Sequence, residues 1–126
     1  MVSVDTNILI RIITRDDEEQ ADQAEAFIKR GAWVSHLVLA ETIWVLARGY
    51  GRTTLQLIET IEILLAHENL SLEEAKVVED ALTAFKKRPV IGFSDHLILE
   101  IARKAGHLPL GTFDRGLAKL KDTQKL

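Results

Sequence analysis

The stretch VSVDTN, residues 2–7, decides how this 126-residue chain is interpreted. Residues 2–4 have the character of a short buried strand, and Asp5 follows them directly, with Thr6 and Asn7 in the turn. In an open parallel sheet, an acid that follows a strand lies at the carboxyl edge, where such folds bind ligands. Asp is also a preferred N-cap residue, so capping of the next helix explains Asp5 equally well at this point.

Outward from this stretch, short apolar segments alternate with longer amphipathic ones. The patterns predict strands at 2–4, 32–35 and 69–72 and a last strand with its turn at 108–114, with helices at 6–13, 16–30, 37–48, 53–67 and 73–88 and from about Ser94. Such alternation predicts an α/β fold, a three-layer α/β/α sandwich with a central, mostly parallel sheet. The chain has no repeat or linker, so residues 1–126 are expected to form a single domain.

Composition limits the chemistry that the chain can perform. It has no cysteine, which excludes disulfides, thiolate nucleophiles and zinc sites built on sulfur, so a metal would be held by oxygen or imidazole. No apolar run is long enough to cross a bilayer, and no targeting segment is recognisable, so we expect a cytoplasmic protein without membrane contact. The net charge of -3 decides little about nucleic-acid binding, because clustered carboxylates can mask a basic surface elsewhere.

Most of the 19 acidic residues belong to charged helix faces, but four do not. These four follow predicted strands or lie in the first turns of predicted helices, and they are Asp5, Glu41, Asp95 and Asp114. Glu41 is the only acid between Glu25 and Glu59, and its neighbours on a helical wheel are apolar. We therefore expect its carboxylate to be costly without a cation, by several kcal/mol. The ordinary alternative is an ion pair with Arg48, although this residue is one turn too far away for a direct i,i+4 pair.

Asp95 and Asp114 also have ordinary alternatives. Asp95, in GFSDHLILEIA, fits an acid favoured by a helix dipole, and Asp114, in GTFDRG, fits a turn aspartate. Taken together, however, all four acids are predicted to gather at one edge of a parallel sheet. Converging carboxylates repel one another unless cations hold them ionised, and oxygen ligands suit Mg²⁺ or Mn²⁺. Two such ions can support hydrolysis of a phosphodiester.

Four motifs carry a resemblance to a known family. VDTN at 4–7, LAET at 39–42, FSDHLI at 93–98 and GTFDR at 111–115 together resemble the PIN-domain ribonucleases, and more narrowly the VapC toxins of toxin-antitoxin pairs. The resemblance spans essentially the whole chain. It implies that Asp5, Glu41, Asp95 and Asp114 hold one or two Mg²⁺ or Mn²⁺ ions and are the catalytic residues. It also implies supporting roles for Thr6, Asn7 and Thr112.

The same resemblance implies endonucleolytic cleavage of RNA by a metal-activated water, leaving a 5′-phosphate and a 3′-hydroxyl. The implied partners are an RNA substrate, a second copy of the chain in a homodimer, and a VapB-like antitoxin whose C-terminal segment covers the active site, with larger toxin-antitoxin assemblies built from these. Two positions depart from the family pattern. Many relatives carry acids where this chain has Gly92 and Gly116, which predicts weaker binding of one of the metals.

Three further residues are candidates for substrate contact. His96 adjoins Asp95, while Arg48 and Arg115 could meet phosphate, although Arg48 also fits a plain surface loop. Two other functions remain open. A catalytically silent binding module would keep the fold for capture of a partner. A phosphatase with an aspartyl nucleophile would need a second acid two residues after Asp5, where this chain has Asn7.

Overall fold

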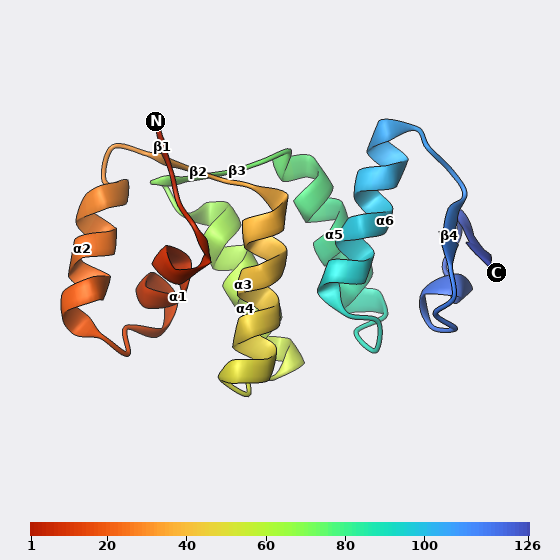
Figure 1. Ribbon diagram of the computed structural model, residues 1–126, viewed down its shortest axis with the longest axis horizontal. Helices are drawn as coiled ribbons and strands as arrows, with labels where there is room; N and C mark the ends of the chain where they lie inside the picture. The colour runs from red at the N-terminus through yellow and green to blue at the C-terminus, as the bar shows by residue number, and fades with distance from the viewer. The chain divides into compact units, whose positions relative to one another are not determined.

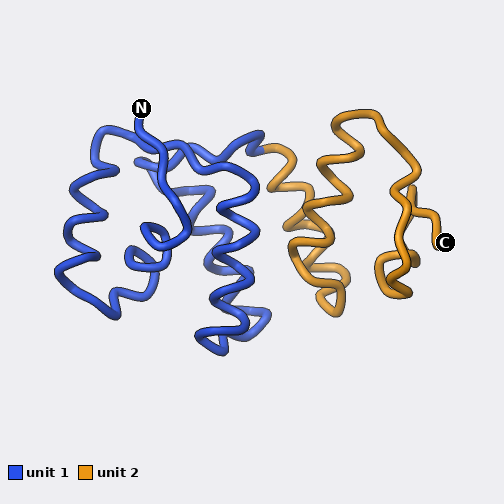
Figure 2. Tube along the Cα trace, in the orientation of Figure 1, with its two compact units in different colours: residues 1–75 blue, residues 76–126 orange.

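A computed structural model describes residues 1–126, and its internal contacts divide the chain into two compact units, residues 1–75 and 76–126 (Figure 2). The expectation of a single domain stays a prediction. Every strand pairing in both units is parallel, and strands alternate with helices through most of the chain. The α/β fold class with parallel pairing that the sequence predicts is therefore confirmed. No helix combines the length and the apolar character that a membrane span requires.

Unit 1 holds three strands and four helices (Figure 1). In chain order these are β1 (Val2–Ser3), α1 (Thr6–Thr14), α2 (Glu18–Ile28), β2 (Ala32–Val34), α3 (His36–Gly49), α4 (Thr54–Ala66) and β3 (Leu70–Leu72). The strand order is β1-β2-β3, with Val2 opposite Ala32 and Ala32 opposite Leu70. Because neighbouring strands run in the same direction, their carboxyl ends lie at one edge of the sheet.

Strands β2 and β3 of unit 1 bury alternate residues. Ala32 and Val34 in β2 are buried, whereas Trp33 between them is 41% exposed. Leu70 and Leu72 in β3 repeat this pattern. Successive side chains in a strand point to opposite faces, so one face of this sheet supports the core of the unit. That core is completed by helix residues that include Leu9, Ile28, Leu39, Leu46, Ile61 and Leu64.

Each helix of unit 1 begins after a polar residue that caps it. The side chains of Asp5, Asp17, Ser35 and Thr53 each accept a hydrogen bond from the amide three residues further on. These bonds satisfy backbone donors that the first turn of a helix leaves without a partner. They set the starts within one or two residues of the predicted ones.

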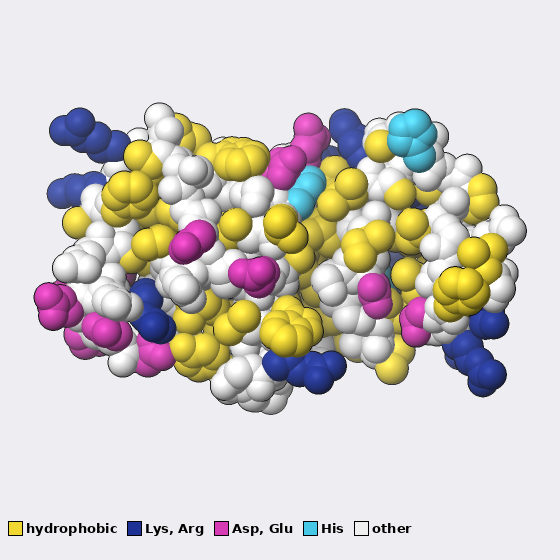
Figure 3. All heavy atoms as spheres, in the orientation of Figure 1, with side chains coloured by type: hydrophobic (Ala, Val, Ile, Leu, Met, Phe, Trp, Pro, Cys, Tyr) yellow, Lys and Arg dark blue, Asp and Glu magenta, His cyan; other side chains and the backbone are white.

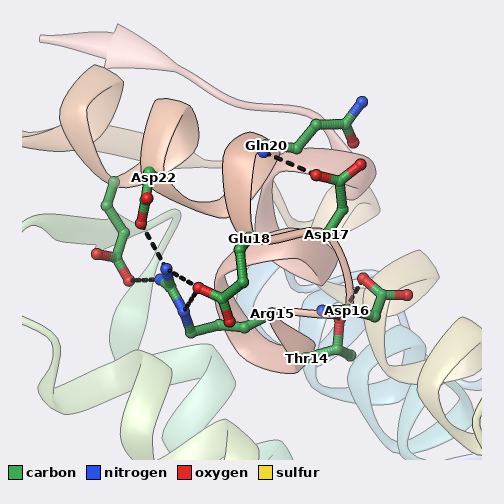
Figure 4. A network of polar contacts seen from close by, with 8 residues as sticks. Thr14, Arg15, Asp16, Asp17, Glu18, Gln20 and Asp22 are labelled. Atoms are coloured by element: carbon green, nitrogen blue, oxygen red, sulfur yellow. Dashed lines mark hydrogen bonds and ion pairs between the residues drawn. The ribbon is translucent and has the colours of Figure 1, made fainter.

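Ionic contacts join α1 to α2. The residue after α1, Arg15, has a left-handed backbone with φ of 49°. Its guanidinium group contacts the carboxylates of Glu18, Asp22 and Glu25, which project from α2 (Figure 4). The hydrogen bonds to these acids raise the pKa of Arg15, so this cation stays charged under all ordinary conditions. Glu18, Asp22 and Glu25 are therefore partnered acids on the surface of the helix pair.

Unit 2 pairs two helices with a small sheet. Its elements are α5 (Ala75–Lys87), α6 (Phe93–Ala105), β4 (Leu110–Thr112), the 3₁₀ turn η1 (Leu117–Lys119) and β5 (Thr123–Lys125). β4 and β5 form a separate parallel pair, with Leu110 opposite Thr123. The rings of Phe85 and Phe93 pack edge to face with their centroids 5.9 Å apart. Because β5 is the polar sequence TQK, no apolar pattern predicts it.

Candidate functional site

Asp5 and Glu41 line the same small pocket of unit 1. Asp5 lies just beyond β1 at the start of α1, and Glu41 lies in the second turn of α3, the helix that follows β2. Since β1 and β2 are parallel neighbours, both helices start at the same edge of the sheet. The pocket has a volume of about 210 Å³ and is lined by Asp5, Thr6, Asn7, Leu37, Val38 and Glu41.

The Asp5 carboxylate has two roles open to it. Its Oδ1 accepts a hydrogen bond of 3.2 Å from the amide of Ile8, so the capping alternative considered for Asp5 is correct. The cap occupies one oxygen, and Oδ2 has no hydrogen bond within the protein. The side chain is exposed at the mouth of the pocket it shares with Glu41. Capping and metal binding are therefore compatible for this residue.

Glu41 is exposed, which corrects the expectation of a costly carboxylate on a buried apolar face. The buried stripe of α3 consists of Leu39, Thr42, Ile43 and Leu46, on the opposite side of the helix. The apolar neighbours Leu37 and Trp44 are themselves exposed, by 76% and 57%. Figure 3 shows acidic side chains interspersed with hydrophobic ones on the surface of this part of unit 1. No ion pair joins Glu41 to Arg48, because the Arg48 guanidinium lies over the Trp44 ring.

Asp95 and Asp114 form a second pair of carboxylates, in unit 2. Asp95 lies in the first turn of α6, and Asp114 lies in the turn after β4. Partial burial of Asp95, and then the negative charge of Asp114, raise the pKa of Asp95, against a smaller opposing effect of His96. The two carboxylates are thus close enough to repel each other.

Local hydrogen bonds hold Asp114 in place. Its Oδ2 accepts a bond of 2.8 Å from the amide of Leu117, at the start of η1, and its own amide donates to Thr112 Oγ1 at 3.0 Å. Oδ1 has no hydrogen bond within the protein. The turn role considered for Asp114 is therefore correct, and it leaves one oxygen for a ligand.

Each unit by itself brings two of the four predicted acids together. No group of three or more Asp, Glu or His side chains is assembled closely enough to hold a metal ion. The expectation that all four carboxylates share one metal site therefore stays a prediction. Asp5 and Glu41 line one pocket, and Asp114 lies near enough to Asp95 to raise its pKa.

The model of one protein family, the PIN domain, matches residues 2–122. The chain belongs to the PIN domain family. No curated protein and no solved structure is similar enough to count as a match. PIN domains are nuclease domains, and their members typically use divalent metal ions. The predicted resemblance to PIN domains is confirmed, and it covers almost the whole chain.

The carboxylates of this PIN domain suit a hard divalent cation. Asp5 and Asp114 each keep one oxygen free after their local hydrogen bonds are counted. The raised pKa of Asp95 shows a negative charge that is poorly compensated where it lies, and a bound cation would compensate it. Such ions prefer carboxylate oxygens and water. A divalent ion bound by such oxygens would acidify a water molecule and neutralise phosphate charge.

The three residues predicted to support the site occupy different environments. Thr6 is buried, and with Asn7 it lines the Asp5 pocket. Thr112 lies at the end of β4, where its hydroxyl accepts the Asp114 amide. Thr112 therefore acts on the geometry of the turn that presents Asp114. Its contribution is positional.

Of the three candidates for substrate contact, His96 is not in a position to touch substrate. Its side chain is 1% exposed, its Nε2 lies 3.0 Å from the carbonyl oxygen of Arg88, and its ring packs against Phe85. His96 is thus a core residue of the PIN domain, which corrects the expectation that it touches substrate. Arg48 and Arg115 are both exposed, as a contact to phosphate requires.

The expected list of site residues does not include Trp44. Its ring is exposed and lies one helical turn from Glu41. The spacing of residues 37, 41, 44 and 48 carries the available signal, because helical positions separated by three or four residues share one face. That face of α3 carries both a carboxylate of the candidate site and an aromatic ring.

Proposed function

We propose that this PIN domain is a metal-dependent endoribonuclease in which Asp5, Glu41, Asp95 and Asp114 act on the same metal ions. The observation that supports it most is the occurrence, within a PIN domain, of two carboxylate pairs whose members retain free oxygens. The convergence of the two pairs rests on the family resemblance. Mg²⁺ and Mn²⁺ are the proposed cofactors, with one or two ions bound.

In the proposed reaction, the four carboxylates would hold the ions and balance their positive charge. A water molecule attacks phosphorus in line with the leaving 3′-oxygen, and the leaving oxygen takes up a proton. The products carry a 5′-phosphate and a 3′-hydroxyl. Attack by the ribose 2′-hydroxyl would instead leave a cyclic phosphate, so the chemistry of the ends tests the mechanism directly.

The decisive experiment compares two aspartates that each cap the start of a helix. Asp17 caps α2 as Asp5 caps α1, with its side chain accepting from the amide of Gln20 at 3.0 Å. Asn is an equally good cap, so D5N and D17N should both fold normally. We expect D5N to lower metal-dependent cleavage of total RNA by about 100-fold or more, since even outer residues of metal sites contribute about 10- to 100-fold. D17N should cleave like the unmodified protein.

We also propose that the protein is the toxin of a toxin-antitoxin pair and forms a homodimer. An open groove of about 540 Å³ between α1 and α2 offers a place for an antitoxin segment beside the candidate site. It is lined by Asp5, Asn7, Ile8, Arg11, Gln20, Gln23, Ala24 and Phe27. Induced expression should arrest growth, D5N should relieve the arrest, and sedimentation should give a dimer mass.

A silent binding module is the second candidate. It is favoured by the lack of any group of three ligating side chains and by glycine at position 116. It predicts that neither Mg²⁺ nor Mn²⁺ raises the melting temperature of the antitoxin-free protein. Cleavage that EDTA abolishes and that D5N lacks would exclude it.

A further inference from the structure

The start of α3 is held by a side chain from a distant part of unit 1. Oε1 of Glu73, the residue after β3, accepts a hydrogen bond of 2.8 Å from the backbone amide of His36, the first residue of α3. This bond satisfies a donor that the first turn of a helix otherwise leaves without a partner. The other helices of unit 1 are capped by the residue directly before them. Because α3 also has such a cap, from Ser35 to the amide of Val38, the bond to Glu73 is an additional, tertiary restraint.

The backbone around Glu73 fixes the position of this side chain. Its amide donates to the carbonyl oxygen of Val34 at 2.8 Å, so the pairing of β2 with β3 extends to Glu73. The next residue, Glu74, has φ of 43°, in the left-handed region that a residue with a side chain seldom adopts. Such a conformation persists only where the surrounding contacts determine it. Glu73 thus connects three elements, because it follows β3, bonds to β2 through its backbone and bonds to α3 through its side chain.

The bond between Glu73 and His36 is partly shielded from water. The side chain of His36 is 13% exposed and that of Glu73 is 38% exposed, and Nδ1 of the imidazole lies 3.8 Å from the same Oε1. A hydrogen bond to a carboxylate is stronger than one between neutral groups, and partial exclusion of water strengthens it further. Loss of the Glu73 side chain would leave the amide of His36 without this partner in a partly buried place.

The restrained turns of α3 form one wall of the candidate site. Leu37, Val38 and Glu41 belong to the first two turns of the helix and line the pocket of about 210 Å³, together with residues 5–7. Glu41 lies about 7.5 Å along the helix axis from His36. A shift of the helix start would therefore move Glu41 relative to Asp5. Glu73 itself does not line the pocket.

We propose that Glu73 is a positioning residue of the nuclease, which fixes the Glu41 carboxylate opposite Asp5 by tying the start of α3 to the end of β3. It acts through Glu41 and touches neither metal nor substrate. This inference rests on the proposed metal-dependent function, and it deepens that function by naming a residue outside the site that sets its metal affinity.

The first experiment titrates Mn²⁺ into the full-length protein by calorimetry. E73A removes the acceptor for the His36 amide and should weaken Mn²⁺ binding about tenfold or more, as expected when a group that orients a metal ligand is lost. E73Q keeps an oxygen acceptor in the same place and should recover most of this affinity. E74A removes the neighbouring glutamate side chain, so it is the matched control and should bind Mn²⁺ like the unmodified protein.

A double-mutant cycle tests whether Glu73 acts through Glu41. E41Q should itself weaken Mn²⁺ binding, because it replaces a carboxylate ligand by an amide. Adding E73A to E41Q should then cause little further loss, whereas two independent effects would add. Amide hydrogen exchange in EDTA gives a second readout that needs no metal. Exchange at His36 should be faster in E73A than in the unmodified protein, and unchanged in E74A.

Four results would overturn the proposal. Equal Mn²⁺ affinity in E73A and the unmodified protein is one, and an E73A effect that adds in full to that of E41Q is another. E73Q as weak as E73A, or E74A as weak as E73A, would assign the effect to negative charge and not to position. If the unmodified protein binds no Mn²⁺, the proposed function fails and the positioning role with it. If the unmodified protein binds Mn²⁺ and E73A binds it equally well, only the positioning role fails.

Discussion

Asp114 raises the pKa of Asp95 by placing a second negative charge near it in unit 2, and partial burial of Asp95 contributes even more. A carboxyl group whose pKa is raised in the folded protein binds its proton more tightly there than in the unfolded chain. Between the ordinary carboxyl pKa and the raised one, stability therefore falls as pH rises. Above that range, the loss of folding stability stays constant.

The first prediction concerns D95N, which removes the negative charge of Asp95 from its partly buried position near Asp114. At pH 7 in EDTA we expect D95N to unfold at a higher temperature than the unmodified protein. The difference should vanish below the ordinary pKa range of a carboxyl group, because Asp95 is then neutral in both states. Mg²⁺ should raise the melting temperature of the unmodified protein more than that of D95N. A lower melting temperature for D95N at pH 7 would contradict the proposed repulsion.

The second prediction separates the capping role of Asp5 from its proposed metal role. D5A removes the acceptor for the Ile8 amide and should lower the free energy of unfolding by about 1 kcal/mol, whereas D5N should not. D17A should lose a similar amount at α2. Urea unfolding of the three variants measures this. Only the two Asp5 variants should lose nuclease activity, and full activity in D5N would remove Asp5 from the site.

The third prediction concerns Gly116, where the family resemblance implies an acid. An added Cβ would lie 3.4 Å from Asp114 Oδ2 and 3.8 Å from Ile91 Cγ1, so a side chain needs only a small adjustment. We expect G116D to bind Mn²⁺ more tightly and to be less stable than the unmodified protein without metal, because a third carboxylate joins Asp95 and Asp114. G116N has nearly the same shape and should do neither. Calorimetric titration with Mn²⁺ compares them.

The fourth prediction tests the core position of His96. H96F keeps a ring against Phe85 but loses the contact to the Arg88 carbonyl, which should cost about 1 kcal/mol of stability. H96A should cost about 2 kcal/mol or more, since it leaves a cavity. Cleavage per folded molecule should stay within about twofold in H96F. A large loss of activity in a stable H96F protein would restore His96 as a substrate contact.

The parts of the fold that the sequence predicts are those with a local physical cause. Helix starts follow from caps such as Asp17 and Thr53, and the buried strands 32–34 and 70–72 follow from short apolar runs. The polar strand β5 has no such signal, because its pairing with β4 depends on a contact that sequence does not display.

The candidate site shows the same limit. The positions of the four acids at strand ends and helix starts are predictable, but the exposure of Glu41 is not. Helix 36–49 is apolar on nearly every side, so a helical wheel cannot tell which side packs. The side that packs contains Leu39 and Leu46, and only tertiary structure selects it. His96 was misjudged for a related reason, since a polar residue type does not reveal a buried environment.

The parallel register also bears on the order in which a ribosome completes this protein. Val2 pairs with Ala32 and Ala32 with Leu70, so each strand of unit 1 can be secured only after a further helical segment has been synthesised. The proposed carboxylates emerge in the order Asp5, Glu41, Asp95 and Asp114. If all four are needed, a nascent chain attached to its own messenger RNA remains harmless to it until Asp114 has left the ribosome.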